Sequence, residues 1–335
     1  MKHIFRIAFV IIFVISAGNI FAHEHIPHQI GVPRIQDDGQ PYHDIITKLA
    51  PDTCKQTGLN GRVKQVAISE EVIESEKPSR ILLSKIYYYD KHGRLVKEQT
   101  FDGQTSRPSI LKYQYRKDGC VSRITIPFDY AYVFRRDNAG RIITVDHYRI
   151  EKGKLSLDIQ DRYEYYQTGR IRSYTEAAHE AMFFMYYNFE YDSSGRLIYA
   201  SIYDNRPEPN VTTHKYTYDN NKIIIDGYVV CQFDSNKKIV SRTCTLEDVI
   251  ERSDYDKKGN LTKVTKTTGE TQTVNIYEYD NHKNLLKITS SVDGKAFVTI
   301  TEYKYKYDKK GNWTSRQSVI GNDPTVHRKI VYYQE

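Results

Sequence analysis

The sequence predicts an all-β protein: an array of antiparallel β-hairpin repeats that forms a long curled or partly closed sheet. A motif of the form aromatic-x-Tyr-Asp-x-x-Gly-Arg/Asn-apolar recurs about ten times. The copies lie 15 to 29 residues apart, which suits hairpins with fixed turns and variable far ends better than a strict solenoid. Tyrosine occurs 29 times in 335 residues. This residue suits a sheet with one packed and one wet face, because its hydroxyl tolerates water.

Residues 1–22 have the pattern of a secretory signal peptide. Lys2 and Arg6 give a positive start, and the apolar run from Ile7 to Ile15 is too short to span a bilayer. Cleavage is expected after Ala22, with Gly18 as the second choice and an uncleaved anchor as the alternative. We therefore expect an exported protein, periplasmic or secreted, with no transmembrane segment after cleavage.

Residues 23–58 form a polar leader that contains Pro27, Pro33 and Pro41 in its first half and a possible short helix over His43–Leu49. If cleavage follows Ala22, the new amino group and the imidazole of His25 would resemble an X-X-His site for Cu(II) or Ni(II), beginning at His23. A solvated leader with chance histidines is the favoured interpretation. No metal or other cofactor is therefore predicted.

The repeat array is expected over residues 59–335, and its clearest copy runs from Tyr87 to Glu98. Tyr87 and Tyr89 are two apart, so they share one face of a strand. Asp90 opens a type I turn by accepting backbone N–H groups. Gly93 occupies the bulge position, which needs a positive φ, and the same is predicted for Gly195, Gly259 and Gly311 in other copies. The apolar residues after Arg94 begin the returning strand. Each unit is therefore a strand, a tight turn and a strand.

Several copies depart from this pattern. The segment Gly58–Val72 carries only the second half of a unit and is expected to be the opening strand. Lysine replaces the turn glycine at Lys222, Lys237 and Lys283, where a left-handed conformation would cost about 1 kcal/mol. Arg136 takes the place of the second aromatic residue in another copy. We expect the three turns with lysine to be weaker or differently shaped, and Arg136 marks another degenerate copy.

The motif resembles the YD repeat, the unit of the Rhs family. Further copies read FEYDSSGRLIYA from Phe189 and YKYDKKGNWTSR from Tyr305, and the resemblance covers roughly residues 61–335. It implies a bacterial protein whose hairpins join edge to edge into a curled sheet. Large members of the family end their repeats with an aspartate-proline-glycine signature that releases a toxin domain. The nearest string here, 322–325 (NDPT), departs from that signature, so we expect no toxin domain.

Charge and cysteine content leave two questions open. The formal net charge is +7, and loss of Lys2 and Arg6 would leave 7 − 2 = +5. A solvated rim with protected sheet edges explains the lysines, and attraction to envelope polyanions is the alternative. The cysteines permit three disulfide connectivities in an exported chain, and a bridge between the last two would need a register shift. They are Cys54, Cys120, Cys231 and Cys244.

The sequence predicts no catalytic, cofactor-binding or metal-binding residue. The recurring aspartates have a structural cause in the turn, and they are Asp90, Asp192, Asp219, Asp234, Asp256, Asp280 and Asp308. His179-Glu180 lacks the second histidine of a zinc-protease helix, because Phe183 stands in its place. Phosphate loops, nucleophile elbows and nucleic-acid modules are not recognisable.

The expected function is therefore that of a non-enzymatic binding or structural module of the bacterial envelope or exterior. Its partner would be an envelope polysaccharide or another envelope protein, and nucleic acid is not expected. Three alternatives remain: a carbohydrate- or wall-binding protein that uses a tyrosine-lined face, an accessory or immunity partner of a secretion system, and an enzyme whose site is assembled across hairpins.

Overall fold

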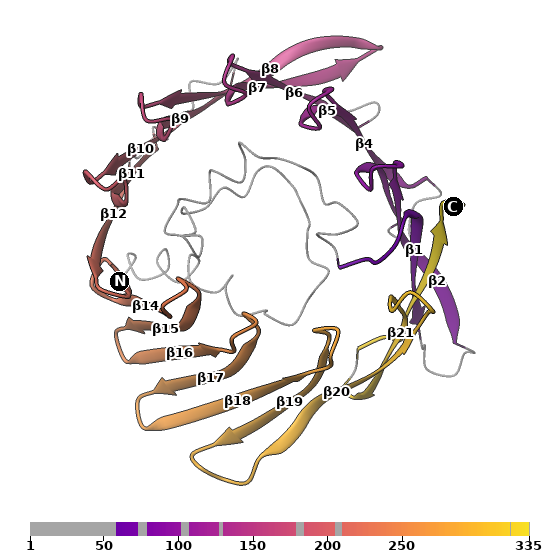
Figure 1. Cartoon of the computed structure of the whole chain (residues 1–335), viewed down its shortest axis with the longest axis vertical. Helices are drawn as coiled ribbons and strands as arrows, with labels where there is room; N and C mark the ends of the chain where they lie inside the picture. The colour runs from indigo at the N-terminus through magenta and orange to yellow at the C-terminus, as the bar shows by residue number, and fades with distance from the viewer. Residues whose placement is uncertain are drawn as a thin grey trace. The chain divides into compact units, whose positions relative to one another are not determined.

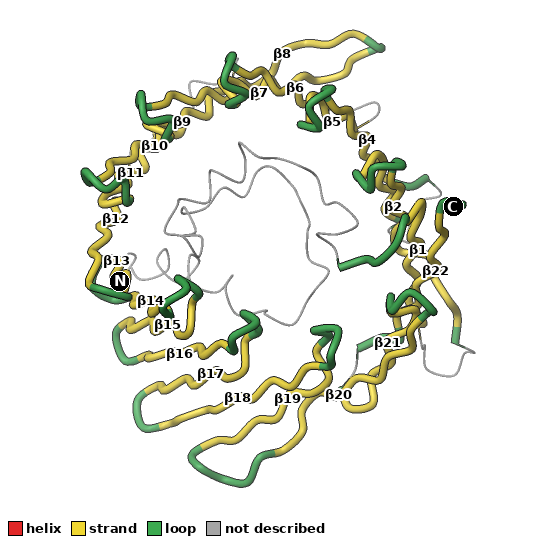
Figure 2. Tube along the Cα trace, viewed as in Figure 1, coloured by secondary structure: helices red, strands yellow, loops and turns green. Residues whose placement is uncertain are grey.

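The computed structural model describes residues 58–72, 79–101, 107–126, 130–178, 184–204, 210–321 and 323–334. Strands and turns make up these ranges, and they contain no helix (Figure 2). The predicted all-β class is confirmed. The signal peptide, the leader and its short helix, and the segment 179–183 lie outside the described residues.

The described residues divide into two compact units, of which the larger contains residues 58–216 and 300–334 and the smaller residues 217–299. The larger unit contains β1 (Val63–Val72), β2 (Arg80–Tyr89), β3 (Leu95–Thr100), β4 (Ser109–Tyr115), β5 (Val121–Ile126), β6 (Tyr130–Arg136), β7 (Ile142–Glu151), β8 (Lys154–Tyr165), β9 (Ile171–Ala178), β10 (Phe184–Tyr191), β11 (Leu197–Asp204), most of β12 (Asn210–Asp219), most of β20 (Val298–Tyr307), β21 (Trp313–Ile320) and β22 (Val326–Tyr332). The smaller unit contains β13 (Lys222–Ile225), β14 (Val229–Phe233), β15 (Ile239–Leu246), β16 (Val249–Tyr255), β17 (Leu261–Thr268), β18 (Thr271–Tyr279) and β19 (Leu285–Val292).

Strand pairing is antiparallel in both units. In the larger unit, β20, β21 and β22 lead into β1, and β1 to β12 then follow in chain order. Figure 1 shows β2 to β12 along an arc, so the predicted curl is present within this unit. In the smaller unit, β13 to β19 pair with their chain neighbours.

The turn of each regular unit has the predicted form. The Gly93 N–H donates to the Asp90 carbonyl at 3.0 Å, and the Asp90 N–H donates to the Arg94 carbonyl at 2.9 Å. The register shifts between Tyr88 and Tyr89, which is the bulge expected after a type I turn. The glycines predicted to have positive φ do so, at Gly93 (78°), Gly195 (78°), Gly259 (83°) and Gly311 (79°).

The copies without glycine divide into two kinds. Lys237 and Lys283 keep the left-handed conformation, with φ of 60° and 67°. Lys222 does not, because it begins β13 after a tighter turn in which Asn220 has φ of 48°. The prediction that Lys222 occupies the glycine position, with Asp219 opening the turn, is therefore wrong. Asparagine tolerates the left-handed region better than lysine does, and that tolerance shortened the loop.

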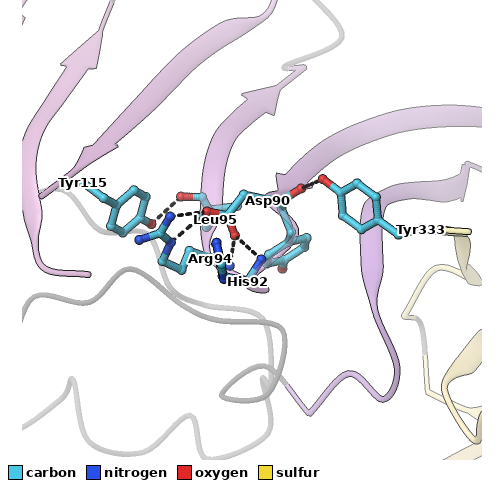
Figure 3. Close-up of polar contacts among 7 residues, drawn as sticks. Asp90, His92, Arg94, Leu95, Tyr115 and Tyr333 are labelled. Carbon is cyan, nitrogen blue, oxygen red and sulfur yellow. Dashed lines mark hydrogen bonds and ion pairs between the residues drawn. The ribbon is translucent and has the colours of Figure 1, made fainter. Parts of the chain in front are cut away.

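A joint between successive units explains the arginine and the second tyrosine of the motif (Figure 3). The Asp90 carboxylate accepts the N–H groups of His92 and Arg94 through Oδ1, at 2.8 and 3.0 Å, and the Arg94 Nε through Oδ2, at 2.7 Å. The guanidinium carbon then lies 4.6 Å from the ring centroid of Tyr115 in the next unit. The Tyr115 hydroxyl donates to the Leu95 carbonyl at 2.5 Å. One aspartate thus fixes its own turn and orients the contact to the neighbour.

The same joint recurs at the copy that carries Arg136. Asp137 binds Arg141 Nε at 2.7 Å, the guanidinium carbon lies 4.6 Å from the Tyr165 centroid, and the Tyr165 hydroxyl donates to the Ile142 carbonyl at 2.6 Å. The turn at Asp137 is as regular as the others. Arg136 takes the strand position that receives the contact from the preceding unit, as Tyr115 does in its copy, so the substitution leaves its own turn unchanged.

Asparagine replaces arginine in the copies nearer the C-terminus. The Nδ2 atoms of Asn260 and Asn284 reach the Oδ2 atoms of Asp256 and Asp280 at 2.8 and 3.0 Å. The shorter side chain keeps the contact within the turn but has no guanidinium to place over the next ring.

Tyrosine also fills the core of the larger unit. The ring centroids of Tyr163 and Tyr174 lie 4.8 Å apart, and those of Tyr174 and Tyr187 lie 5.2 Å apart. All three residues are buried, together with Phe189. These tyrosines serve the cross-strand packing that the sequence predicts.

A pair of glycine substitutions separates backbone strain from the joint. Gly195→Ala and Gly259→Ala place a methyl group at similar positive φ, which costs about 1 kcal/mol in each case. At Gly259 the methyl group meets open space, whereas at Gly195 it overlaps the guanidinium of Arg170, which stacks on Tyr191. We expect the larger loss of unfolding free energy at Gly195, measured by urea denaturation. Equal losses would show that the contact of Arg170 with Tyr191 does not contribute to the free energy of unfolding. Gly269, which lies outside the motif, is not a strain-free control, because its φ is also positive, at 57°.

A double-mutant cycle tests the arginine–tyrosine contact directly. Arg94→Asn reproduces the turn found at Asn260 but removes the cation–π contact with Tyr115. Combined with Tyr115→Leu, it should show a coupling of about 0.5–1 kcal/mol in the free energy of unfolding. Additive effects of the two changes would show that the stacked geometry contributes no stability.

Candidate functional site

The β19–β20 connection forms a rigid hairpin tip in the smaller unit. Asp293 and Gly294 both have positive φ, at 50° and 69°, and the Lys295 N–H donates to the Val292 carbonyl at 3.0 Å. These features define a type I′ turn with the favoured Asp-Gly sequence. The Asp293 N–H donates to the Gln272 carbonyl and Asp293 Oδ1 accepts the Gln272 N–H, both at 2.8 Å. The tip is therefore held to β18.

The apolar side chains of this tip are exposed. Phe297 is 50% exposed and Val298 is 63% exposed, and Val292 beside them is also exposed. We name these three residues the apolar tip. An ordered backbone that presents an aromatic and two aliphatic side chains to solvent is typical of a contact surface. Lys295 adds a positive charge next to them.

Within the part of the chain that the structure describes, no second, exposed stripe of tyrosines accompanies the packed one. Among the described residues with large exposed apolar side chains, the aromatic ones are Tyr186 and Phe297. The remaining exposed side chains of this kind are aliphatic. This distribution leaves the tyrosine-lined face without the exposed rings that stacking on sugars would need.

A polar cluster around one buried carboxylate lies on β6, β7 and β8 of the larger unit. Asp146 is 2% exposed, its Oδ2 accepts Arg135 Nε at 2.6 Å, and its Oδ1 accepts Gln160 Nε2 at 2.8 Å. Burial acts to raise the pKa of Asp146, but the Arg135 guanidinium and the Gln160 amide outweigh it and hold the pKa below its usual value. This carboxylate is an ion-paired anion, not a proton donor.

The opposite face of the same strands carries a histidine–aspartate pair. His147 Nε2 lies 3.0 Å from Asp161 Oδ2, and both side chains are buried. The Tyr132 ring meets the His147 ring edge-on at 4.8 Å. Asp161 Oδ1 is buried and accepts no hydrogen bond within the described part of the chain. Sequence reasoning missed this pair, because the two residues stand 14 apart on separate strands and belong to no motif.

The motif aspartates and several tyrosines have shifted pKa values with structural causes. Burial acts to raise the pKa of Asp90, but hydrogen bonds from Arg94 and His92 outweigh burial and hold the pKa below its usual value. The same balance lowers the pKa of Asp256. Burial, assisted by a hydrogen bond to Asp308, raises the pKa of Tyr332 to about 12. At neutral pH these carboxylates are anionic acceptors and this phenol is a neutral donor, as the joints require.

The cysteines, the histidines of the leader and His179 are the remaining candidates from the sequence. Cys120, Cys231 and Cys244 are free thiols, and Cys54 lies outside the described residues. The register places Cys244 opposite Val229 and not opposite Cys231, which confirms the offset inferred from the sequence. The histidines of the leader and His179 also lie outside the described residues.

The described ranges hold no group of three or more histidine, cysteine or acidic side chains arranged for a metal ion. No helix in them has the length and apolar character to cross a bilayer.

Comparison with known proteins identifies the repeat. The family model for the RHS Repeat matches residues 255–296, which run from the end of β16 to the hairpin tip. That segment contains two turns of the motif, at Asp256 and Asp280. No curated protein matches the chain in sequence.

Solved structures resemble the chain only distantly. TcdB2-TccC3 without its hypervariable C-terminal region is 13% identical over 69% of this chain and 13% of that one, with a TM-score of 0.37. TcdB2-TccC3-TEV is 14% identical over 77% of this chain and 15% of that one, with a TM-score of 0.31. A porin-like protein from Bacteroides uniformis is 12% identical over 81% of this chain and 99% of that one, with a TM-score of 0.25. The chain thus spans a small fraction of the two toxin complexes, and likenesses this distant carry no inference about function.

The family assignment depends on the matched segment and on the turns. The Asp-x-x-Gly/Lys turn of residues 255–296 has the same hydrogen bonds as the turns of the larger unit, at Asp256 as at Asp90. Residues 255–296 therefore match the RHS Repeat, and the turns elsewhere in the described chain share the geometry of this segment, as the recurring tyrosine–aspartate hairpin indicated.

Proposed function

We propose that the protein is exported and acts as a non-enzymatic binding or structural module of the bacterial envelope or exterior. One observation carries the proposal: the carboxylates of the motif are engaged within their own turns. The aspartates of the bulged turns accept backbone N–H groups of the residues that follow them, as Asp280 does from His282 and Asn284 at 2.8 Å. The recurring residues of the described turns thus have a structural role in the scaffold.

The apolar tip is the proposed contact surface. It stands on a turn that hydrogen bonds fix in place, so binding would cost little ordering of the chain. Exposed phenylalanine and valine side chains suit an apolar patch of another envelope protein better than a polysaccharide. An envelope protein is therefore the favoured partner, and the wall-binding alternative is less favoured.

The enzyme alternative has one specific observation in its support, the buried pair of His147 and Asp161. A histidine held by a carboxylate is the arrangement of a general base. Both side chains are buried, and the Tyr132 ring packs edge-on against the imidazole of His147. A structural role in the core accounts for the same geometry, and we favour it.

Export is tested by the N-terminus of the protein recovered from cells. Amino-terminal sequencing of the envelope fraction should begin near His23 or Asn19, because signal peptidase cuts after a small residue that follows the apolar run. Recovery of chains that begin at Met1 in the cytoplasm would contradict the proposal.

Contact through the apolar tip is tested by capture on immobilised ligands. Purified peptidoglycan, lipopolysaccharide and outer-membrane protein extract should be compared, and retention is expected on the protein extract. Phe297→Ser with Val298→Ser should weaken retention about tenfold, because burial of both side chains is lost. Val211→Ser, at a strand position that is 58% exposed in the larger unit, is the matched control and should retain binding.

The result also separates the alternatives. Retention on peptidoglycan or lipopolysaccharide that the tip substitutions leave unchanged would favour the wall-binding function. Turnover in a hydrolase panel that is abolished by His147→Ala, in a protein that remains folded, would favour the enzyme.

A further inference from the structure

We infer that residues 60–63 and 326–333 form one repeat that is split between distant parts of the chain, so that β22 is a donor strand seated in an acceptor site beside β1. In an ordinary copy, Leu95 pairs with Tyr89 and the Asp90 N–H donates to the Arg94 carbonyl at 2.9 Å. The first arm, the turn and the second arm follow one another in the sequence.

The split copy repeats this geometry with its parts far apart in the chain. Val63 pairs with Tyr332, and the Tyr333 N–H donates to the Arg62 carbonyl at 2.8 Å. Gly61 has a φ of 84°, close to the 78° of Gly93. Gly61, Arg62 and Val63 therefore take the places of the motif glycine, arginine and apolar residue. The opening strand, which the sequence showed to lack its first arm, receives that arm from β22.

Tyr333 stands where the motif has aspartate. Tyr166 is the precedent within this chain, because it occupies the same position and its N–H donates to the Arg170 carbonyl at 2.8 Å. Both hydroxyls then donate to a carbonyl in the next first arm, from Tyr166 to Phe189 at 3.0 Å and from Tyr333 to Tyr89 at 2.7 Å (Figure 3). Where tyrosine replaces the motif aspartate, its hydroxyl therefore contacts the next unit, whereas the aspartate carboxylate contacts its own turn.

The pairing of β22 is stronger toward β1 than toward its neighbour in the chain. With β21 it pairs at Ser315–His327 and Arg316–Val326. With β1 the register runs from Val63–Tyr332 to Glu70–Val326, and the Glu71 N–H continues it to the Thr325 carbonyl at 2.8 Å. A strand that depends mainly on a partner remote in sequence is the arrangement of strand addition.

The preceding turn holds both halves of the split repeat together. Asn312 Oδ1 accepts the Asn60 N–H at 2.7 Å, and Asn312 Nδ2 donates to the Asn60 carbonyl at 2.9 Å and to the Tyr332 hydroxyl at 2.7 Å. The Tyr332 hydroxyl in turn donates to Asp308. The buried side chain of Asn312 therefore forms hydrogen bonds both to the main chain before β1 and to the tyrosine at the end of β22.

The acceptor site has a defined ligand class, an extended peptide with a spaced set of side chains. The side chains of Val326 and Arg328, two residues apart on β22, are both buried on the same face of the strand. The Arg328 guanidinium carbon lies 3.9 Å from the Trp313 ring centroid. Main-chain pairing with β1 supplies affinity, and these side chains with Tyr332 supply specificity. A free peptide corresponding to residues 324–335 should therefore occupy the site.

The test uses the full chain with a protease recognition sequence inserted after Gly321, in the exposed β21–β22 connection. After cleavage, the C-terminal peptide should remain bound during gel filtration, and a labelled synthetic peptide of residues 324–335 should exchange into the site. A peptide with Arg328→Ala should compete about tenfold more weakly, because the cation–π contact is lost. A peptide with Lys329→Ala, changed at an exposed position, is the matched control and should compete normally.

Each other outcome also decides the inference. Loss of the peptide from a chain that keeps its β-sheet circular dichroism would overturn it, since β22 would then be an appended strand. If the chain unfolds on cleavage, labelled peptide is added during refolding. Recovery of the sheet signal with one peptide bound per chain would support the donor strand, and no recovery would overturn it.

Discussion

The fold depends on a joint in which one carboxylate organises both a turn and the contact to the next unit. A hairpin of two strands is only marginally stable in water, so each unit here needs its neighbour. Asp90 meets that need by fixing Arg94, whose guanidinium lies over Tyr115. The tyrosine hydroxyl returns to a carbonyl of the first unit. Stacked units thus share side chains as well as main-chain hydrogen bonds, and this sharing couples their stabilities.

The variation among copies follows from which part of the joint is retained. Asn260 keeps the contact to the turn carboxylate and gives up the stacked cation. Tyr166 gives up the carboxylate and reaches forward with its hydroxyl, while Arg170 still stacks on Tyr191. The main-chain bonds of the turn persist in both cases. Backbone geometry is therefore the constant of the repeat, and the side chains are alternative means of joining one turn to the next.

The sequence predicted the hairpins well, because the information for a turn lies within five consecutive residues. Glycine positions with positive φ, such as Gly93 and Gly311, could be assigned directly. Lys222 was misassigned, because a two-residue turn at Asn220 competes with the bulged one and spacing alone does not separate them. The pair of His147 and Asp161 could not be predicted, since their proximity depends on the register between β7 and β8.

The split repeat shows how a short array can manage its strand edges. An exposed edge strand offers unpaired N–H and C=O groups to any other chain, and proteins protect such edges by covering or pairing them. Here β22 pairs with the edge of β1. Residues 61–63, which are distant from β22 in the sequence, complete the turn that follows it. The repeated motif thus also specifies how β22 meets β1, because Gly61 and Tyr333 complete the same turn that Gly93 and Asp90 make within one segment. Function can then reside in positions that the repeat leaves unconstrained, such as the far-end turn that carries Phe297.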